Sequence, residues 1–267
     1  MISSLDNNKI KEVCRLAAKK KERFSRGLFV AEGEKQVFEA PEERVKIIFC
    51  TADFADSHPE AIVPGITEIV SDRVFAKMSD TDTPQGILAV VQMNEIRPED
   101  IYQNSEMRSD DLPFILFLEN IRDPGNLGTI VRTAEAAGVT GIVMSEGTVD
   151  IYNPKTVRST MGSIYRVPFL YADDLYGELE RAKKSGITIY AAFLDSSMPY
   201  YDAEFAKPVG VLIGNEAAGL TSRAAQMADE RIVIPMSGDA ESLNAAVAAA
   251  VITFEGRRQR GCKQAEV

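Results

Sequence analysis

The stretch "RIVIPMSGDAESLNAAVAAAVITFEGRRQR", residues 231–260, joins a strand-like apolar run, a small polar loop and an alanine-rich helix. Alanine is the best helix former but buries little area, so such a helix suggests that something packs too closely for large side chains. We expect the helix over 242–260, with Ser242 and Asn244 in its first turn. Because these two residues do not share a helical face, a site that uses both must wrap around the start of the helix.

Apolar runs and helical patterns alternate through the C-terminal part of the chain. The runs lie at 114–119, 141–145, 187–193, 209–214 and 231–235, and the helical patterns at 126–138, 153–161, 173–185, 221–228 and 242–260. Runs without two-residue alternation are typical of strands buried on both faces. The alternation predicts an α/β fold with a mostly parallel sheet, in which ligands bind at the carboxyl ends of the strands.

The N-terminal part predicts a second, smaller α/β domain. It combines a basic helix near 7–22 and a helix near 72–79 with strands at 28–32, 45–50, 67–70 and 86–93. Residues 93–112 are polar and acidic without a sustained period, which is typical of a linker. We therefore expect domains at 1–92 and 113–267, joined by the linker 93–112.

The composition of the 267 residues, 45% hydrophobic and 26% charged, is that of an ordinary globular protein. There is no apolar run of the roughly 18 residues that a membrane span needs, and the first residues lack the apolar core of a signal peptide. Cys14, Cys50 and Cys262 are scattered and odd in number, without CxxC spacing. This argues against a disulfide framework or a metal site and favours the reducing cytoplasm.

Histidine and charge restrict the chemistry further. His58 is the single histidine, and its setting "DSHPE" favours a solvated loop residue, so we expect catalysis without a histidine base. A net charge of −10 disfavours a nonspecific nucleic-acid binder. However, residues 1–35 hold nine Lys or Arg against five acids. This segment is either a solvated face or a local phosphate-binding surface.

Two further polar loops follow predicted strands. In "ENIRDPGNLGTIVRTAEAAG" (119–138), Asn126 is a plausible helix cap, and Arg132 lies opposite the apolar stripe, where it could simply be solvated. The segment has neither GxGxxG nor a P-loop pattern. In "VLIGNEAAGL" (211–220), Gly214 allows close approach of a ligand or a positive φ, and Glu216 could be a turn residue or a site residue.

Taken together, these motifs resemble those of the SpoU (TrmH-like) RNA ribose 2′-O-methyltransferases of the SPOUT class. The similarity lies in "NIRDPGNLGTIVRTAEAAGV", "NPKTVRSTMGSIYRVP", "LIGNEAAGL" and "IPMSGDAESLNAAVAAAVITFE", in that order, and extends over 114–260. Through "FVAEGEKQVFEA" and "DTDTPQGILAVV", residues 1–92 are similar to the ribosomal-protein-like substrate-binding domain of many members. The resemblance implies a trefoil-knotted C-terminal fold, S-adenosylmethionine as cofactor, no metal, and a homodimer in which the last helix packs closely.

The resemblance also implies site residues. The family's catalytic positions fall on Asn126, Arg132, Glu216, Ser242 and Asn244, and its largely backbone contacts to the cofactor fall on Gly214, Ile234, Met236 and Leu243. A guanidinium is a poor base, because its pKa exceeds about 12. We therefore expect Arg132 to stabilise the developing alkoxide and to hold an RNA phosphate, with the proton acceptor unassigned. Arg158 and the basic segment 1–35 are further candidate RNA contacts.

The expected activity is S-adenosylmethionine-dependent methylation of a ribose 2′-hydroxyl in RNA. The N-terminal domain type favours ribosomal RNA over transfer RNA, by analogy with the family. Two alternatives stay open, a transfer RNA substrate and a noncatalytic RNA-binding protein that retains the fold. A nicotinamide oxidoreductase is disfavoured, since the dinucleotide fingerprint is absent.

Overall fold

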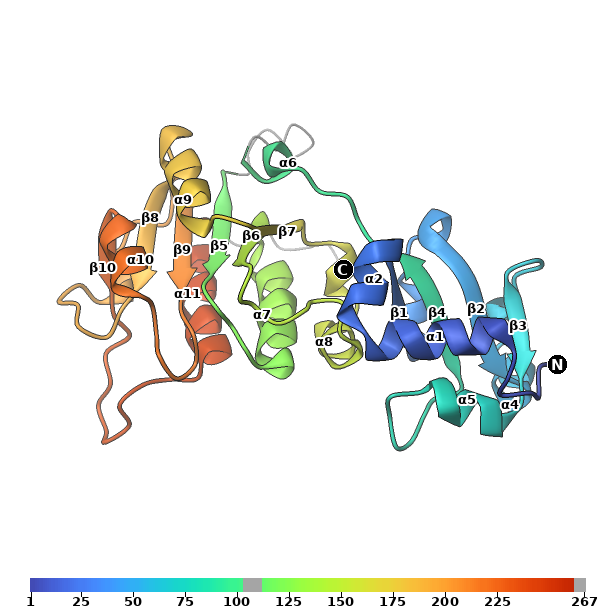
Figure 1. Ribbon diagram of the computed structural model, residues 1–267. Helices are drawn as coiled ribbons and strands as arrows, with labels where there is room; N and C mark the ends of the chain where they lie inside the picture. Colours follow the sequence, from blue (N-terminus) through green and yellow to red (C-terminus); the bar gives the residue numbers. More distant parts are fainter. Residues whose placement is uncertain (103–111, 262–267) are drawn as a thin grey trace. The chain divides into compact units, whose positions relative to one another are not determined.

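A computed structural model describes residues 1–102 and 112–261 (Figure 1). Contacts divide the chain into two compact units. The N-terminal unit comprises 1–95 and 150–165, and the C-terminal unit comprises 96–149 and 166–267. Cys262 and part of the expected linker, 103–111, lie outside the described residues.

The N-terminal unit is a four-stranded sheet with helices around it. Its strand order is β1-β4-β2-β3, with β2 and β3 parallel and the other pairs antiparallel. Apolar side chains of α1 and α5 share a core with the sheet, as the helical spacing of Ile10, Val13 and Leu16 requires. The elements are α1 (Asn8–Ala18), α2 (Lys20–Arg26), β1 (Leu28–Glu32), α3 (Glu34–Phe38), β2 (Val45–Thr51), α4 (Ala52–Ser57), β3 (Thr67–Val70), α5 (Asp72–Met78), β4 (Ile87–Gln92) and α8 (Pro154–Thr160).

Residues 150–165, including α8, pack within the N-terminal unit although they lie between two strands of the other unit. Arg23 is 2% exposed, and its Nε donates to Asp150 Oδ2 at 2.8 Å. The Gln36 amide donates to the carbonyl oxygens of Val157 and Arg158 at 3.0 and 3.3 Å. A buried charge is stable only when it is paired. Arg23 therefore connects the segment 150–165 to the rest of the N-terminal unit and is not available as a surface cation.

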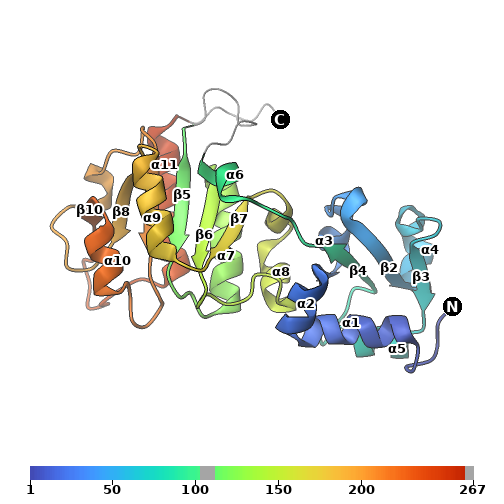
Figure 2. The same cartoon turned by 45° about the horizontal axis from the view of Figure 1, so that its top comes forward.

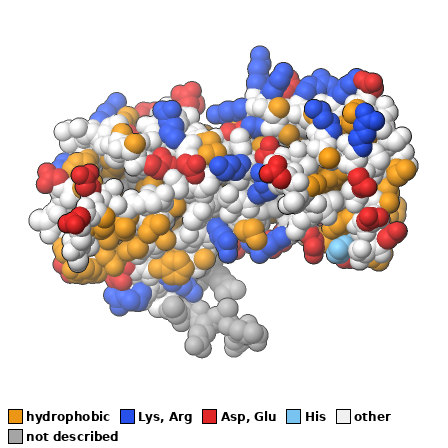
Figure 3. Space-filling view, turned by 90° about the horizontal axis from the view of Figure 1, so that it is seen from below, with side chains coloured by type: hydrophobic (Ala, Val, Ile, Leu, Met, Phe, Trp, Pro, Cys, Tyr) orange, Lys and Arg blue, Asp and Glu red, His pale blue; other side chains and the backbone are white. Residues whose placement is uncertain are grey.

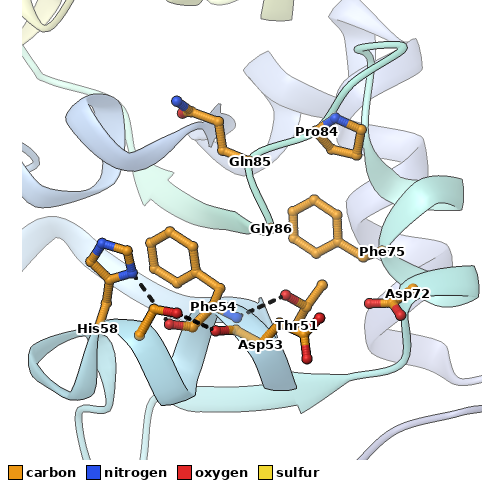
Figure 4. A pocket seen from close by; sticks show the side chains of 10 residues that line it. Thr51, Asp53, Phe54, His58, Asp72, Phe75, Pro84, Gln85 and Gly86 are labelled. Carbon is orange, nitrogen blue, oxygen red and sulfur yellow. Dashed lines mark hydrogen bonds between the residues drawn. The ribbon is translucent and has the colours of Figure 1, made fainter.

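His58 ends α4 and is not a freely solvated loop residue, in contrast to the expectation from its sequence setting. Its ring stacks on Phe54 with centroids 4.2 Å apart and an interplanar angle of 15°. Its Nδ1 lies 3.3 Å from the Phe54 carbonyl oxygen (Figure 4). The half-buried ring lines a cavity of the N-terminal unit together with Asp53 and Asp72.

The C-terminal unit confirms the expected parallel sheet. Its six strands have the order β10-β8-β9-β5-β6-β7, and every pair is parallel. In the two ribbon views, α7 and α11 cover one face of the sheet and α9 and α10 the other (Figures 1 and 2). The elements are α6 (Pro98–Tyr102), β5 (Phe114–Leu118), α7 (Pro124–Ala137), β6 (Gly141–Ser145), β7 (Phe169–Ala172), α9 (Leu175–Lys184), β8 (Thr188–Ala192), β9 (Val209–Ile213), α10 (Ser222–Met227), β10 (Glu230–Ile232) and α11 (Ala245–Gln259).

The sheet has a switch point between β5 and β9. From β5 the chain continues outward through β6 and β7, and it returns on the other side through β8, β9 and β10. The loops that leave β5 and β9 therefore diverge at their carboxyl ends, which is where open α/β sheets bind ligands. The trefoil knot that the resemblance implies stays a prediction.

The alanine-rich helix α11 packs closely against its neighbours. Ala245, Ala246 and Ala249 are at most 6% exposed, and α11 lies against α7. A Cβ on Gly256 would come within 2.6 Å of the Phe114 ring of β5. The small side chains are therefore explained by close packing against α7 and the sheet.

Candidate active site

Three loops meet at the switch point through a network of hydrogen bonds. The Asn126 Nδ2 donates to Glu216 Oε1, and the Asn244 Nδ2 donates to Asn126 Oδ1, both at 2.9 Å. Thus Asn126, Glu216 and Asn244, predicted as site residues from three separate motifs, are in direct contact. They come from α7, from the loop after β9 and from the start of α11.

Asn126 reaches this network because it does not cap its helix, contrary to our expectation. Asp123 is the N-cap of α7, and its Oδ1 accepts from the Asn126 backbone N–H at 2.8 Å. Pro124 occupies the first turn, where a missing N–H costs nothing. The Asn126 side chain is thereby available to bond both Glu216 and Asn244.

The start of α11 also differs from the expected one. Asn244 is the N-cap, with its Oδ1 accepting from the N–H groups of Ala246 and Val247 at 2.9 and 3.3 Å. The helix begins at Ala245, so Ser242 lies in the preceding loop and not in the first turn. The Asn244 side chain thus caps the helix through its oxygen and binds the Asn126 side chain through its nitrogen.

Glu216 is an anchor between loops. Its carboxylate accepts from the backbone N–H groups of Arg122 and Asp123, both at 3.2 Å, in addition to Asn126. Partial burial opposes ionisation, but these hydrogen bonds outweigh it and lower the pKa of Glu216 below its ordinary value of 4.5. The sequence left open whether Glu216 is a turn residue, and the structure shows it bridging to the loop after β5.

Replacing Glu216 with glutamine should weaken this bridge in a pH-dependent way. A carboxylate with a lowered pKa adds stability that is present above its unfolded pKa and lost as pH falls through the folded value. At neutral pH we expect a loss of roughly 1.5 to 3 kcal/mol in the free energy of unfolding, the range for hydrogen bonds to charged groups. Urea unfolding measured from neutral pH to below 4.5 should show the difference shrinking as wild-type Glu216 becomes protonated.

Glu230→Gln is the matched control, since within the described residues no bond to the Glu230 side chain occurs and it is exposed. We expect that variant to track the wild type at every pH. Equal, pH-independent effects of both substitutions would contradict the anchoring role of Glu216.

A cavity opens beside the network, between the loops after β8, β9 and β10. Its walls include six of the predicted residues, namely Gly214, Glu216, Ile234, Met236, Ser242 and Leu243. The remaining lining is mainly apolar, with Phe193, Leu194, Ile213 and Ile232 among it. Leu194 and Met236 are 64% and 36% exposed, so apolar surface is available there for a ligand.

One of the two roles expected for Gly214 is wrong, and the other, close approach of a ligand, stays a prediction. Gly214 does not have a positive φ. A Cβ at this position would lie 2.3 Å from the Gly219 carbonyl carbon and from the Leu220 nitrogen. The glycine is therefore needed because the loop folds back on its own backbone, where Asn215 and Gly219 exchange two backbone hydrogen bonds of 3.0 and 2.9 Å.

Arg132 does not join the network within one chain. It is exposed on α7, and its side chain has no hydrogen bond or ion pair with any residue in 1–102 or 112–261. Six positions along a helix also turn its side chain about 120° away from that of Asn126. The guanidinium is consequently free to bind an anionic group from outside the chain.

The sequence analysis did not identify two polar residues, Asn215 and Glu119, that hold these loops in place. Asn215 donates to the Asn120 carbonyl at 2.8 Å and accepts from the N–H groups of Ala217 and Ala218. Glu119 is 3% exposed and accepts from the backbone N–H and hydroxyl of Thr221, each at 2.8 Å. A polar residue within two positions of the end of a buried strand was the available signal for both.

Comparison with known protein families shows to which family this chain belongs. Residues 113–254, more than half of the chain, match the SpoU rRNA Methylase family, and residues 7–89 match the MRM3-like substrate binding domain. The chain belongs to the SpoU rRNA methylase family. The membership predicted from the sequence motifs is thereby confirmed.

Three relatives of this SpoU-family protein resemble it over nearly its whole length. The Bacillus subtilis 23S rRNA (guanosine(2553)-2′-O)-methyltransferase RlmP is 33% identical, over 96% of this chain and 98% of its own. The AdoMet-bound rRNA methyltransferase from Sinorhizobium meliloti has 32% identity and a TM-score of 0.82, covering 96% and 97% of the two chains. The AviRb methyltransferase of Streptomyces viridochromogenes in complex with AdoMet has 27% identity and a TM-score of 0.81, covering 95% and 98%.

Two further findings concern membranes and metals. No helix in the described ranges combines the length and hydrophobicity that crossing a bilayer requires. Among the same residues, no group of three or more His, Cys, Asp or Glu side chains is arranged to hold a metal ion.

Proposed function

We propose that this SpoU-family protein transfers the methyl group of S-adenosylmethionine to a ribose 2′-hydroxyl of ribosomal RNA. The observation that carries the proposal is the network joining Asn126, Glu216 and Asn244 beside a mainly apolar cavity at the sheet's switch point. It is supported by relatives named for 2′-O-methylation of 23S rRNA and by relatives solved with AdoMet.

The cavity fits such a cofactor. Its isoleucine and leucine side chains suit an adenine ring and an aliphatic chain, and the Glu216 carboxylate at its wall suits a cationic ligand. Gly214, Ile234, Met236 and Leu243 are our proposed cofactor contacts. When bound, S-adenosylmethionine supplies a methyl group on a positively charged sulfur, which is ready for in-line displacement.

The chain's own residues then align the hydroxyl and stabilise its charge. Our proposal assigns to Arg132, which lies outside the network within one chain, a permanent cation that stabilises the developing alkoxide and holds a neighbouring phosphate of the bound RNA. Asn126, Glu216 and Asn244 fix the three loops, and Ser242 lines the cavity, where its hydroxyl can hydrogen-bond the cofactor or the ribose. Positioning of two bound reactants is itself a large part of the rate enhancement.

The activity is tested with tritium-labelled S-adenosylmethionine and two acceptors, ribosomal RNA and transfer RNA from cells lacking the protein. We expect label in ribosomal RNA, recovered after digestion as 2′-O-methylnucleoside. Label in transfer RNA alone would mean that transfer RNA, and not ribosomal RNA, is the substrate. Absence of both transfer and S-adenosylmethionine binding by calorimetry would favour the noncatalytic RNA-binding alternative.

The RNA-binding part of the proposal rests on residues 1–92, joined through 93–112 to a methyltransferase domain at 113–267. Within the basic segment 1–35, Arg23 is buried, and Lys9 and Arg26 pair with acids. Lys19 and Lys21 are exposed and have no ion pair in the described residues, so they are our foremost phosphate contacts. We propose that the protein acts in the cytoplasm, as its scattered cysteines without a disulfide pattern favour.

We also propose a homodimer formed through α11. Val247 and Phe254 are 47% and 50% exposed, and seven positions apart they share one face of the helix. Hydrophobic side chains gather on one side of the C-terminal unit in the space-filling view (Figure 3). An exposed apolar stripe of this kind is typical of a subunit interface.

Replacing Val247 and Phe254 together with glutamate should convert the dimer to a monomer, because four charges would be buried in the symmetric interface. Light scattering measures this as a halving of the mass. Ile62→Glu, at a 41% exposed apolar residue of the N-terminal unit, is the control and should stay dimeric. A wild-type protein with the mass of a single chain would contradict the proposed dimer.

A further inference from the structure

A second cavity with aromatic and polar walls lies within the N-terminal unit. It is lined by residues of α3, including Gln36 and Phe38, and by Arg158 and Met161 from the segment 150–165. Its volume of about 540 Å³ is within the range of small-ligand sites, roughly 300 to 1,000 Å³. Phe38 and Met161 are 42% and 39% exposed, so two large apolar side chains face solvent at one cavity.

Met161 is held in an unusual conformation. Its φ of 51° is in the left-handed region, and its N–H donates to the Arg158 carbonyl at 3.1 Å to end α8. Glycine is the residue that adopts this conformation without strain. A large, exposed, apolar side chain at such a position costs stability, which suggests that the side chain itself is used.

Two polar atoms of the lining residues lack hydrogen-bond partners. Gln36 is 4% exposed, and because its amide nitrogen donates to two carbonyl groups, its Oε1 is the acceptor left without a donor. The Arg158 Nη1 is also buried without a hydrogen bond, 3.6 Å from Glu32 Oε2. Both residues line the cavity, although these two atoms are themselves shielded from solvent and the Arg158 Nη1 is ion-paired with Glu32. A base edge would reach them through a small shift of the Gln36 and Arg158 side chains, which would give the buried atoms the hydrogen bonds that they lack.

The charges around the cavity favour a base over a phosphate. Three acids, Glu32, Glu34 and Glu39, line it against two cations, Lys35 and Arg158. Glu32 is buried and accepts from Thr81 Oγ1 at 2.9 Å and the Asp80 N–H at 3.0 Å. A slightly acidic wall repels a phosphate, whereas an uncharged base can stack on the exposed side chains.

The cavity beside His58 is a weaker candidate. Its aromatic residues Phe54 and Phe75 are only 7% and 1% exposed, and Asp53 and Asp72 add charge without a cation among the lining residues (Figure 4). None of the unpartnered buried atoms of the described residues belongs to its lining.

We propose that the cavity between α3 and Met161 binds one unpaired nucleobase of the RNA substrate. The base stacks on Phe38 and Met161, and its polar edge faces Gln36 and Arg158. This inference rests on the proposed RNA methyltransferase function and adds to it a base-binding pocket in the substrate-binding unit. Base stacking on a protein aromatic is worth about 1 to 3 kcal/mol, so one lost stacking partner corresponds to roughly a 5- to 150-fold change in affinity.

The test compares Phe38→Ala and Met161→Gly with wild type in the full-length protein. Fluorescence anisotropy is measured with labelled ten-nucleotide oligouridylate, oligoadenylate and oligocytidylate, and with a ten-base-pair RNA duplex. We expect at least fivefold weaker binding of the best single strand by each variant and unchanged binding of the duplex. With ribosomal RNA from cells lacking the protein, KM should rise while kcat stays within about twofold.

Met161→Gly separates binding from folding, because relief of the positive-φ strain should leave its melting temperature at or above that of wild type. Ile62→Ala is the control, an exposed apolar truncation in the same unit away from the cavity. If wild type methylates RNA but both variants keep its single-strand affinity and KM, the base pocket is overturned. The base pocket is also overturned if the variants lose affinity for the single strand and the duplex equally. If wild type transfers no methyl group to RNA, the proposed function fails instead.

Discussion

Replacing Arg132 with alanine is expected to lower kcat for methyl transfer by about a hundredfold to a thousandfold, the usual cost of losing one stabilising group at a developing oxyanion. The Arg132 side chain is exposed on α7 and has no hydrogen bond or ion pair in the described residues, so the fold does not depend on it. The measurement is transfer of tritiated methyl groups to RNA, alongside calorimetric binding of S-adenosylmethionine and a melting curve. We expect only the first to change.

Arg132→Lys serves as the graded control. It keeps the charge but loses the planar fork that binds phosphate in two places, so it should fall between alanine and wild type. Arg73→Ala, at an exposed arginine of α5, should be silent. Full activity of Arg132→Ala would remove this residue from the chemistry.

The second large effect is expected for Gly214→Ala. The new methyl group would lie 2.3 Å from backbone atoms of Gly219 and Leu220, which cannot move aside as a flexible side chain could. The loop carrying Glu216 must therefore open, and with it a wall of the cofactor cavity. We expect S-adenosylmethionine affinity to fall by more than about tenfold, which is 1.4 kcal/mol, within the cost of overpacking.

Gly238→Ala is its control, because nothing lies within 4 Å of a Cβ there and its φ is not positive. Calorimetry on both variants gives the affinities. If Gly214→Ala binds S-adenosylmethionine as tightly as wild type does, the loop can relax around the added methyl group. Its observed backbone contacts are then not needed for the cavity.

Periodicity predicted the sheet well and its edges less well. The long apolar runs of β5, β6, β8 and β9 are evident because strands buried on both faces have no polar interruptions. The four-residue strand β7, Phe169–Ala172, was not predicted, since two of its residues are only half-buried and its sequence "FLYA" is too short to show a period.

Helix starts were predicted less accurately because several candidate caps compete. Before α11, Asp239, Ser242 and Asn244 can all cap, and only Asn244 is additionally held by Asn126. Before α7, Asp123 followed by proline takes the cap that we assigned to Asn126. These choices depend on contacts between loops and not on local preference.

The site itself could be predicted only through the resemblance. Asn126 and Glu216 are 90 positions apart, and nothing in local spacing brings them to a 2.9 Å contact. The burial of Arg23 with Asp150, 127 positions away, could likewise not be predicted, and neither could the packing of residues 150–165 within the N-terminal unit. Sequence spacing carries no information on pairings made between distant loops.

The central claim is that three loops at the switch point hold a methyl donor against a ribose hydroxyl. The most direct measurement is a map of 2′-O-methylated positions in ribosomal RNA from cells with and without this protein, complemented by wild type or by Arg132→Ala. We predict one ribose methylation that disappears with the protein, returns with wild type and does not return with the variant. Identical maps in all strains, or methylation restricted to bases, would contradict the account.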